Sequence, residues 1–232
     1  MFGLTVIAEH ERLIEAGWKF AESGAMAGHL NFRMGEPGRV LLAAVEEAGI
    51  PALVASLAGE PVFLAQGVGN LNLPGSHAQD YHMDGNFQRR LFIANVCLVP
   101  TDIANGATAL VPGSNHAAMS YWRFSRGGWP ARAVRPALKP GDVLIRPSNL
   151  WHRGTPNRTA RPRPMGAFSW LPQSLGGAPG EIADLDGPLT IFGNKYYGRW
   201  RRMKEFTAVR LPWMDEGLRL GKSFYQDWRA AS

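Results

Sequence analysis

The sequence predicts a mainly β protein in which an N-terminal helical layer covers an antiparallel β-core. Apolar residues in the first third recur at close to a 3.6-residue period, which is typical of amphipathic helices. From Val62 onward, short apolar runs are instead separated by turns rich in glycine, proline and asparagine. Because no strand-like run alternates with a long helical one, a doubly wound parallel sheet is excluded and a sandwich or barrel of short strands is expected.

The helical layer is predicted to occupy residues 1–60. Its first helix is expected between Leu4 and Phe20, where the apolar positions are Leu4, Ile7, Leu13, Ile14 and Trp18. A second helix is expected over Val40–Ala48, and Gly49 and Pro51 are expected to end it.

The β-core with the functional site is predicted to span residues 61–172. Its apolar runs read VFLAQGV, LFIANVCLV, ATALVP, DVLIRP and MGAFSWLP. Residues 173–232 are expected to form a C-terminal lid or basic segment that is helical over Tyr196–Phe206. A length of 232 residues suits one domain, so we expect the whole chain to form a single unit.

Cysteine content and hydropathy narrow the cellular setting. The single cysteine, Cys97, excludes an intramolecular disulfide and a cysteine zinc cluster, and is typical of a reducing compartment. No run reaches the roughly 18 apolar residues that a membrane helix requires, and the N-terminus lacks the basic segment and cleavage site of a signal peptide. We therefore expect a cytoplasmic protein with no membrane partner.

The net charge of +6 raises the question of an acidic partner. A nucleic-acid binder normally adds a recognisable module, and the sequence contains none, so no nucleic-acid partner is expected. Part of the excess lies in the basic aromatic stretch Lys195–Lys204. This stretch is either a surface helix with solvated cations or a lid that recognises an anionic substrate through Arg199, Arg201 or Arg202.

A possible metal site lies in the segment Gln79–Gly85. Side chains two residues apart in an extended strand project to the same face, so His82 and Asp84 can reach a single ion. Two histidines and one carboxylate on one face of an octahedron leave three positions open, an arrangement that suits Fe(II) binding a co-substrate and oxygen together. Asp80 has the same parity as His82 and competes with Asp84 to be the carboxylate ligand.

A second histidine and an arginine complete the pattern further along the chain. His152 ends one strand run and Arg163 enters the next. If these two strands form a hairpin, both side chains point into one cavity. A buried guanidinium needs an anionic partner and matches a carboxylate bidentately, so a dicarboxylate could chelate the metal at one end and pair with Arg163 at the other.

These residues resemble the phytanoyl-CoA dioxygenase family over about Asn70 to Trp170, nearly half of the chain. The resemblance rests on the order Gln79-x-x-His82-x-Asp84, then Asn105-Gly106-Ala107-Thr108-x-x-x-Pro112-Gly113-Ser114-x-His116, then His152 with Arg163 eleven residues on. Members of the family are Fe(II)- and 2-oxoglutarate-dependent oxygenases. The resemblance implies a double-stranded β-helix, a jelly-roll variant related to the cupins, with an N-terminal helical layer.

The resemblance also implies roles for individual residues. It makes His82, Asp84 and His152 the iron ligands and Arg163 the partner of the distal 2-oxoglutarate carboxylate. Further co-substrate contacts are implied for Gln79, Thr108 and Asn95. The chain departs from the family at Gly154, where many members carry a hydroxyl residue, so a hydrogen bond to the co-substrate is either missing or supplied by Thr108.

The expected activity is therefore an iron- and O2-dependent oxidation of a small-molecule substrate, with release of succinate and CO2. Hydroxylation is the default outcome because Asp84 occupies the third protein position, although desaturation, ring closure and epimerisation use the same ligands. One alternative is a cupin-like metal-dependent isomerase or binding protein without 2-oxoglutarate, which would hold its metal with three or four histidines and would not need Arg163. Another is a nucleic-acid-associated protein without catalytic activity.

Overall fold

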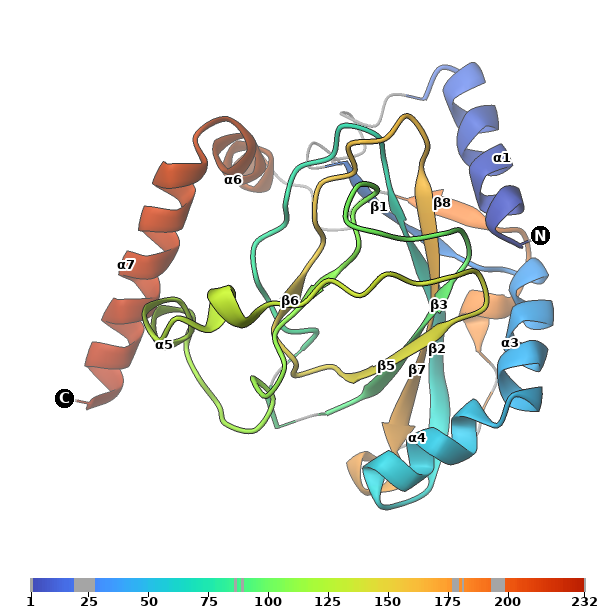
Figure 1. Cartoon of the computed structure of the whole chain (residues 1–232), viewed down its shortest axis with the longest axis horizontal. Helices are drawn as coiled ribbons and strands as arrows, with labels where there is room; N and C mark the ends of the chain where they lie inside the picture. The colour runs from blue at the N-terminus through green and yellow to red at the C-terminus, as the bar shows by residue number, and fades with distance from the viewer. Residues whose placement is uncertain are drawn as a thin grey trace.

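The computed structural model of the chain describes residues 2–18, 28–85, 87–88, 90–176, 180, 182–192 and 199–231 (Figure 1). The helices are α1 (Phe2–Glu15), α3 (Pro37–Glu47), α4 (Ile50–Ala58), α5 (Tyr121–Arg126), α6 (Arg199–Arg210) and α7 (Pro212–Ala231), with short 3-10 turns η1 (Trp129–Arg132), η2 (Gln173–Leu175) and η3 (Ala183–Leu185). The strands are β1 (His29–Arg33), β2 (Val62–Asn72), β3 (Phe92–Cys97), β4 (Ala109–Leu110), β5 (Val143–Pro147), β6 (His152–Arg153), β7 (Arg163–Pro172) and β8 (Thr190–Phe192).

The described strands form one large and one small antiparallel sheet. The large sheet has the strand order β5-β3-β7-β2-β1-β8, and the small one pairs β4 with β6. Neighbouring strands of the large sheet are far apart in sequence, which is typical of jelly-roll connections rather than of a meander. This confirms the predicted mainly β architecture with N-terminal helices.

Alternation along the strands divides the large sheet into an apolar face and a polar one. On β7, Phe168 and Trp170 are buried in the hydrophobic core, whereas Met165, Ala167 and Ser169, at the alternate positions, line a cavity. On β1, Leu30 and Phe32 belong to the core in the same way. The core therefore lies on one face of the sheet, and the polar residues collect on the other face.

The helices α1, α3 and α4 lie together on one side of the large sheet (Figure 1). Val6, Val45 and Val54, one from each helix, are almost fully buried in the core. The predicted helix Val40–Ala48 does end where expected, but the chain turns at Gly49, with φ of 72°, and begins α4 directly, with Pro51 in its first turn. In the described part of the chain no single helix is long and apolar enough to cross a membrane, while α3 and α4 reach that length and composition only as a pair bent by 66°.

The predicted boundaries of the β-core differ from the sheet. Strand β1 lies within residues 1–60, which were expected to be helical, and β8 lies within residues 173–232. Both are short, at five and three residues, so alternation over them is too brief to distinguish a strand from a loop. They pair with each other, and β1 also pairs with β2, so tertiary contacts stabilise them.

The predicted hairpin between the strands of His152 and Arg163 is wrong. Strand β6 pairs with β4 in the small sheet, whereas β7 pairs with β2 and β3 in the large one. The segment between β6 and β7 therefore crosses from one sheet to the other. His152 and Arg163 still meet at one cavity because the two sheets face each other across it.

The C-terminal helices α6 and α7 lie beyond the small sheet, on the side away from α1 and α3 (Figure 1). Helix α7 packs on α5, and Arg219 of α7 donates a hydrogen bond of 3.1 Å to the carbonyl oxygen of Tyr81. The helix expected over Tyr196–Phe206 corresponds to α6 from Arg199 onward. The side chains of Arg199, Arg201 and Arg202, proposed from the sequence as a lid, lie outside the described residues.

Candidate metal centre

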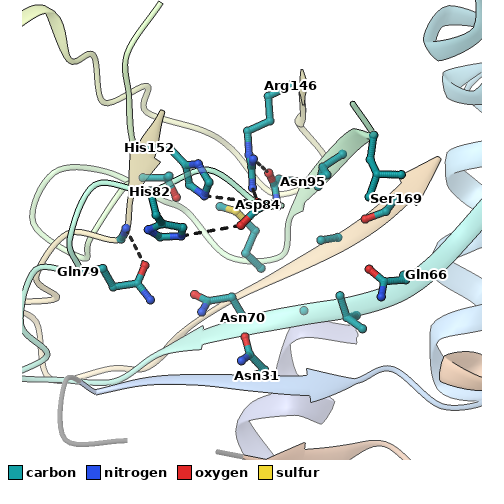
Figure 2. Close-up of a pocket in the computed structure, with 18 of the residues that line it drawn as sticks. Asn31, Gln66, Asn70, Gln79, His82, Asp84, Asn95, Arg146, His152 and Ser169 are labelled. Atoms are coloured by element: carbon teal, nitrogen blue, oxygen red, sulfur yellow. Dashed lines mark hydrogen bonds and ion pairs between the residues drawn. The ribbon is translucent and has the colours of Figure 1, made fainter. Parts of the chain in front are cut away.

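The polar face of the large sheet lines a cavity of ≈ 470 Å³. All seven residues predicted for the site line this cavity: Gln79, His82, Asp84, Asn95, Thr108, His152 and Arg163. Further polar side chains on its wall were not singled out from the sequence: Asn31, Gln66, Asn70, Arg146 and Ser169 (Figure 2).

A two-residue backbone bridge fixes the two histidines side by side. The amide of His82 donates to the carbonyl oxygen of His152, and the amide of His152 donates back, each at 2.9 Å. Residues that exchange both hydrogen bonds of an antiparallel pair lie directly opposite each other, so their side chains project in the same direction. The centroids of the two imidazole rings are 4.5 Å apart.

Each imidazole is oriented by the carbonyl group two residues before it. Nδ1 of His82 lies 2.8 Å from the oxygen of Asp80, and Nδ1 of His152 lies 2.9 Å from the oxygen of Leu150. A carbonyl oxygen only accepts, so the proton of each neutral ring sits on Nδ1 and the lone pair is on Nε2. Burial lowers the pKa of His152 to about 3, which keeps this ring neutral.

Asp84 completes a group of three ligand atoms. Its backbone amide donates to the carbonyl oxygen of Ser148 at 2.8 Å, which ties the Asp84 segment to the residues that follow β5. Its carboxylate oxygens lie 3.8 Å from Nε2 of His82 and 3.4 Å from Nε2 of His152 (Figure 2). The competing carboxylate of Asp80 instead pairs with Arg219 at 2.5 Å, on helix α7.

Arg146 is the most important side chain at this site that was missed from the sequence. Its Nη2 donates to Asp84 Oδ2 at 2.6 Å, and its Nε donates to Asn95 Oδ1 at 3.2 Å. Burial would raise the pKa of Asp84, but Arg146 and the two histidines outweigh it and hold that pKa below its ordinary value. The available signal was a lone charged residue within the apolar run Val143–Pro147, since a charge there needs a buried partner.

The chemistry of this group fits a divalent cation. His82, Asp84 and His152 each offer one ligand atom, and these atoms all lie within 4.8 Å of one another. Two imidazole lone pairs and a carboxylate converge, and a hydrogen-bond donor reaches only the carboxylate. Neighbouring ligands of a metal bonded at about 2.1 Å lie roughly 3 Å apart, so a small contraction closes the group around one ion.

Arg163 provides a second, separate charge on the cavity wall. Its side chain is only 2% exposed, and its Nη2 donates to the carbonyl oxygen of Gly106 at 2.8 Å. Nε has no hydrogen-bond partner, and no carboxylate among the described residues pairs with the guanidinium. Burial lowers the pKa of Arg163 to about 10, so it stays charged at neutral pH. A buried cation without a carboxylate partner is suited to an anionic ligand.

The residues around Gly154 explain its lack of a side chain. Gln79 Oε1 accepts a hydrogen bond of 2.9 Å from the amide of Gly154. A Cβ atom at position 154 would lie 2.6 Å from Cε1 of His29 and 2.8 Å from Gln79 Oε1. His29 and Gln79 therefore occupy the space that a hydroxyl side chain at this position would need. Thr108 also lines the cavity, so it stays the residue predicted to supply the hydroxyl group that position 154 lacks.

Comparison with protein families and curated proteins gives one consistent result. The family model of phytanoyl-CoA dioxygenase (PhyH) matches residues 36–165, more than half of the chain. Dioxygenase cdmA of Talaromyces verruculosus is 33% identical over 98 residues, which cover 37% of this chain and 32% of that protein. Dioxygenase andF of Emericella variicolor is 32% identical over 111 residues, 43% of this chain and 37% of that protein. The matched segments thus span about a third of each curated relative.

Solved structures share the fold. The epimerase SnoN, in complex with Fe3+, alpha ketoglutarate and nogalamycin RO, superposes with a TM-score of 0.57 at 22% identity, covering 84% of this chain and 86% of SnoN. EctD from S. alaskensis with bound Fe gives a TM-score of 0.52 at 20% identity, covering 68% of each chain. At these identities the similarity supports the predicted jelly-roll fold class.

The Arg146–Asp84 ion pair predicts that a bound metal ion can replace the positive charge of Arg146 beside Asp84. Arg146→Met leaves the carboxylate of Asp84 without its cation, so the metal-free protein should lose about 1–3 kcal/mol of unfolding free energy. A bound divalent ion restores the missing charge, so Mn(II) should raise the Tm of Arg146→Met more than it raises that of the wild type. Arg158→Met, at an exposed position, is the control. An equal or smaller Mn(II) shift in Arg146→Met would contradict this account of the site.

Proposed function

Because the chain belongs to the phytanoyl-CoA dioxygenase family, we propose that it is an Fe(II)- and 2-oxoglutarate-dependent oxygenase that acts on a small-molecule substrate. The family uses Fe(II), 2-oxoglutarate and O2. In this proposal His82, Asp84 and His152 hold the iron, and Arg163 pairs with the distal carboxylate of 2-oxoglutarate.

The observation that carries the proposal is the buried charge of Arg163. A guanidinium that is 2% exposed and pairs with no described carboxylate is costly unless a ligand supplies the negative charge. The same cavity contains the His82–Asp84–His152 group, so one dicarboxylate can interact with both. The cupin-like alternative, with three or four histidine ligands and no use for Arg163, is less well supported by this arrangement.

Each residue has a defined task in this proposal. His82 and His152 present the Nε2 lone pair because their Nδ1 protons are held by backbone carbonyls, an arrangement that fixes ring orientation in metal sites. Arg146 keeps Asp84 ionised and restrains one of its oxygens. Gln79, Thr108 and Asn95 are proposed to contact the co-substrate.

The proposed iron would supply the oxidising chemistry, in which decarboxylation of 2-oxoglutarate to succinate and CO2 is coupled to oxidation of the substrate by O2. We propose hydroxylation as the outcome because a carboxylate, Asp84, occupies the third protein position. Desaturation, ring closure and epimerisation use the same protein ligands. The cytoplasmic location and the single-domain organisation stay predictions, and the stretch Lys195–Lys204 stays open between a solvated surface helix and a lid that recognises an anion.

Anaerobic titration with Fe(II) and 2-oxoglutarate tests the proposal and its carboxylate ligand together. The wild type is expected to develop the visible charge-transfer band of 2-oxoglutarate chelated to Fe(II). Asp84→Ala should lose this band and tight iron binding, because two imidazoles alone do not complete the site. Asp80→Ala is the matched control, since that carboxylate pairs with Arg219, and it should keep the band. A wild type without the band would refute the function, whereas loss of the band in Asp80→Ala alone would refute the ligand assignment.

The role of Arg163 predicts a selective loss of co-substrate affinity. Arg163→Ala leaves the distal carboxylate desolvated without a partner, which typically costs roughly 3 kcal/mol or more, so the Kd of 2-oxoglutarate should rise about a hundredfold or more. Fe(II) affinity without 2-oxoglutarate should change little. Arg161→Ala, at an exposed position two residues away, should leave both constants near the wild-type values. Near-normal 2-oxoglutarate binding by Arg163→Ala would exclude the proposed salt bridge.

A further inference from the structure

We propose that the substrate is an uncharged small molecule with several hydroxyl groups, recognised by a set of neutral polar side chains on the cavity wall. The proposal rests on the proposed function, because it concerns the substrate of the same site. We call these side chains the amide wall, and they are Asn31, Gln66, Asn70, Asn95 and Ser169.

The register of the large sheet brings the amide wall together. Asn31 of β1 lies opposite Asn70 of β2, and Gln66 of β2 lies opposite Ser169 of β7. Asn95 lies on β3, opposite Ala167. In Figure 2 Gln66 and Ser169 lie across the cavity from Gln79, with the two histidines and Asp84 between them. Gln66 and Ser169 thus lie on the far side of the site from Gln79, which accepts a hydrogen bond from the amide of Gly154.

Much of the hydrogen-bonding capacity of the amide wall is unused. The structure gives the side chains of Asn31, Gln66 and Ser169 no hydrogen-bond partner among the described residues, and Ser169 is only 4% exposed. Polar side chains on an inward-facing strand position cost stability relative to apolar ones unless a ligand or water satisfies them. Only the buried Ser169 bears this cost, because Asn31 and Gln66 are exposed and hydrated at the cavity wall. All three leave hydrogen-bonding groups free for a polar ligand.

The amide wall offers both hydrogen-bond donors and hydrogen-bond acceptors to a ligand. Asn70 uses Nδ2 to donate to the carbonyl oxygen of Leu30 at 3.2 Å, which leaves its Oδ1 as an acceptor. Asn95 uses Oδ1 to accept from Arg146, and the two hydrogens of its Nδ2 can serve the co-substrate and the substrate together. Asn31, Gln66 and Ser169 can do both. Hydroxyl groups also donate and accept, so a polyhydroxylated molecule matches this wall, whereas an acyl chain would leave it unsatisfied.

The charges on the cavity wall argue against an anionic substrate. Among the described lining residues, the charged side chains are Asp84, Arg146 and Arg163. Arg146 is already paired with Asp84 at 2.6 Å, and Arg163 is assigned to the co-substrate. On the described wall of the cavity, no further cation is then available to replace the hydration of a carboxylate or phosphate group. The neutral amide wall is what remains for the substrate, and neutral hydrogen-bonding groups select neutral partners.

The test uses proton relaxation of small probes on protein loaded with Mn(II) and 2-oxoglutarate. The probes are methyl glucoside, the corresponding methyl glucuronoside, which adds a carboxylate, and cyclohexanol, which keeps a six-membered ring with one hydroxyl. A probe that binds beside the paramagnetic ion is relaxed, so the measurement reports binding in this cavity without requiring turnover. We expect methyl glucoside to bind at least tenfold more tightly than either of the other probes.

The matched variants are Gln66→Leu and Asn31→Leu, which replace exposed carboxamides of similar size that have no described partner. Each should weaken methyl glucoside binding about three- to tenfold, and the two together more, with Mn(II) and 2-oxoglutarate affinity unchanged. Gln226→Leu, an exposed carboxamide on α7 outside the cavity, should have no effect.

Three outcomes would overturn the proposal: equal or tighter binding of the glucuronoside or cyclohexanol, no binding of methyl glucoside to loaded protein, or full binding by the Gln66→Leu/Asn31→Leu double variant. Failure of the proposed function is read separately, from the protons of 2-oxoglutarate. If 2-oxoglutarate is not relaxed by Mn(II) on the wild type, the proposed function is wrong. Probe binding is then measured by calorimetry on the same sample, where the same order of affinities still decides this inference.

Discussion

The site depends on the reciprocal backbone hydrogen bonds between His82 and His152. These two bonds of 2.9 Å join the segment after β2 to the small sheet, and they place the two imidazoles side by side. Because each Nδ1 is held by a carbonyl two residues earlier, the orientation of the rings follows from the backbone path itself. Asp84 reaches the same point because its own amide is bonded to Ser148, in the turn between β5 and β6. Backbone pairing therefore brings all three proposed ligands together before any metal binds, which lowers the entropy cost of binding one.

The two buried arginines near this group differ in their partners. Arg146 is paired with Asp84 and held by Asn95, so it acts within the protein. Arg163 is more deeply buried and, among the described residues, has only a carbonyl oxygen as a hydrogen-bond partner, so its charge is available to a ligand. Between them the large sheet presents neutral carboxamides instead of further charges. Since the opposite face of this sheet contains the hydrophobic core, the same strands provide stability on one face and recognition on the other.

Much of this arrangement could be predicted from the sequence, because it depends on local spacing. The apolar and polar alternation of Arg163–Pro172 identifies β7, and the motif around His82 identifies His82 with Asp84 or Asp80. The family resemblance then favours Asp84 and adds His152 to the proposed metal site. Arg146 could not be assigned a role, because its partner Asp84 is 62 positions away and comes close only when β5 pairs with β3. The amide wall draws on four strands whose neighbours are set by the crossovers of the sheet, so no local pattern reveals it. The expected hairpin failed for the same reason, since adjacency in sequence does not determine which sheet a strand joins.

The most direct test of the central claim is the crystal structure of the protein grown without O2 in the presence of Mn(II) and 2-oxoglutarate, with anomalous diffraction to locate the metal. The account predicts one anomalous peak bonded by Nε2 of His82, Nε2 of His152 and an oxygen of Asp84, with the distal carboxylate of 2-oxoglutarate on Arg163. A metal peak bonded by other residues, or a distal carboxylate paired with Arg146 instead of Arg163, would contradict it.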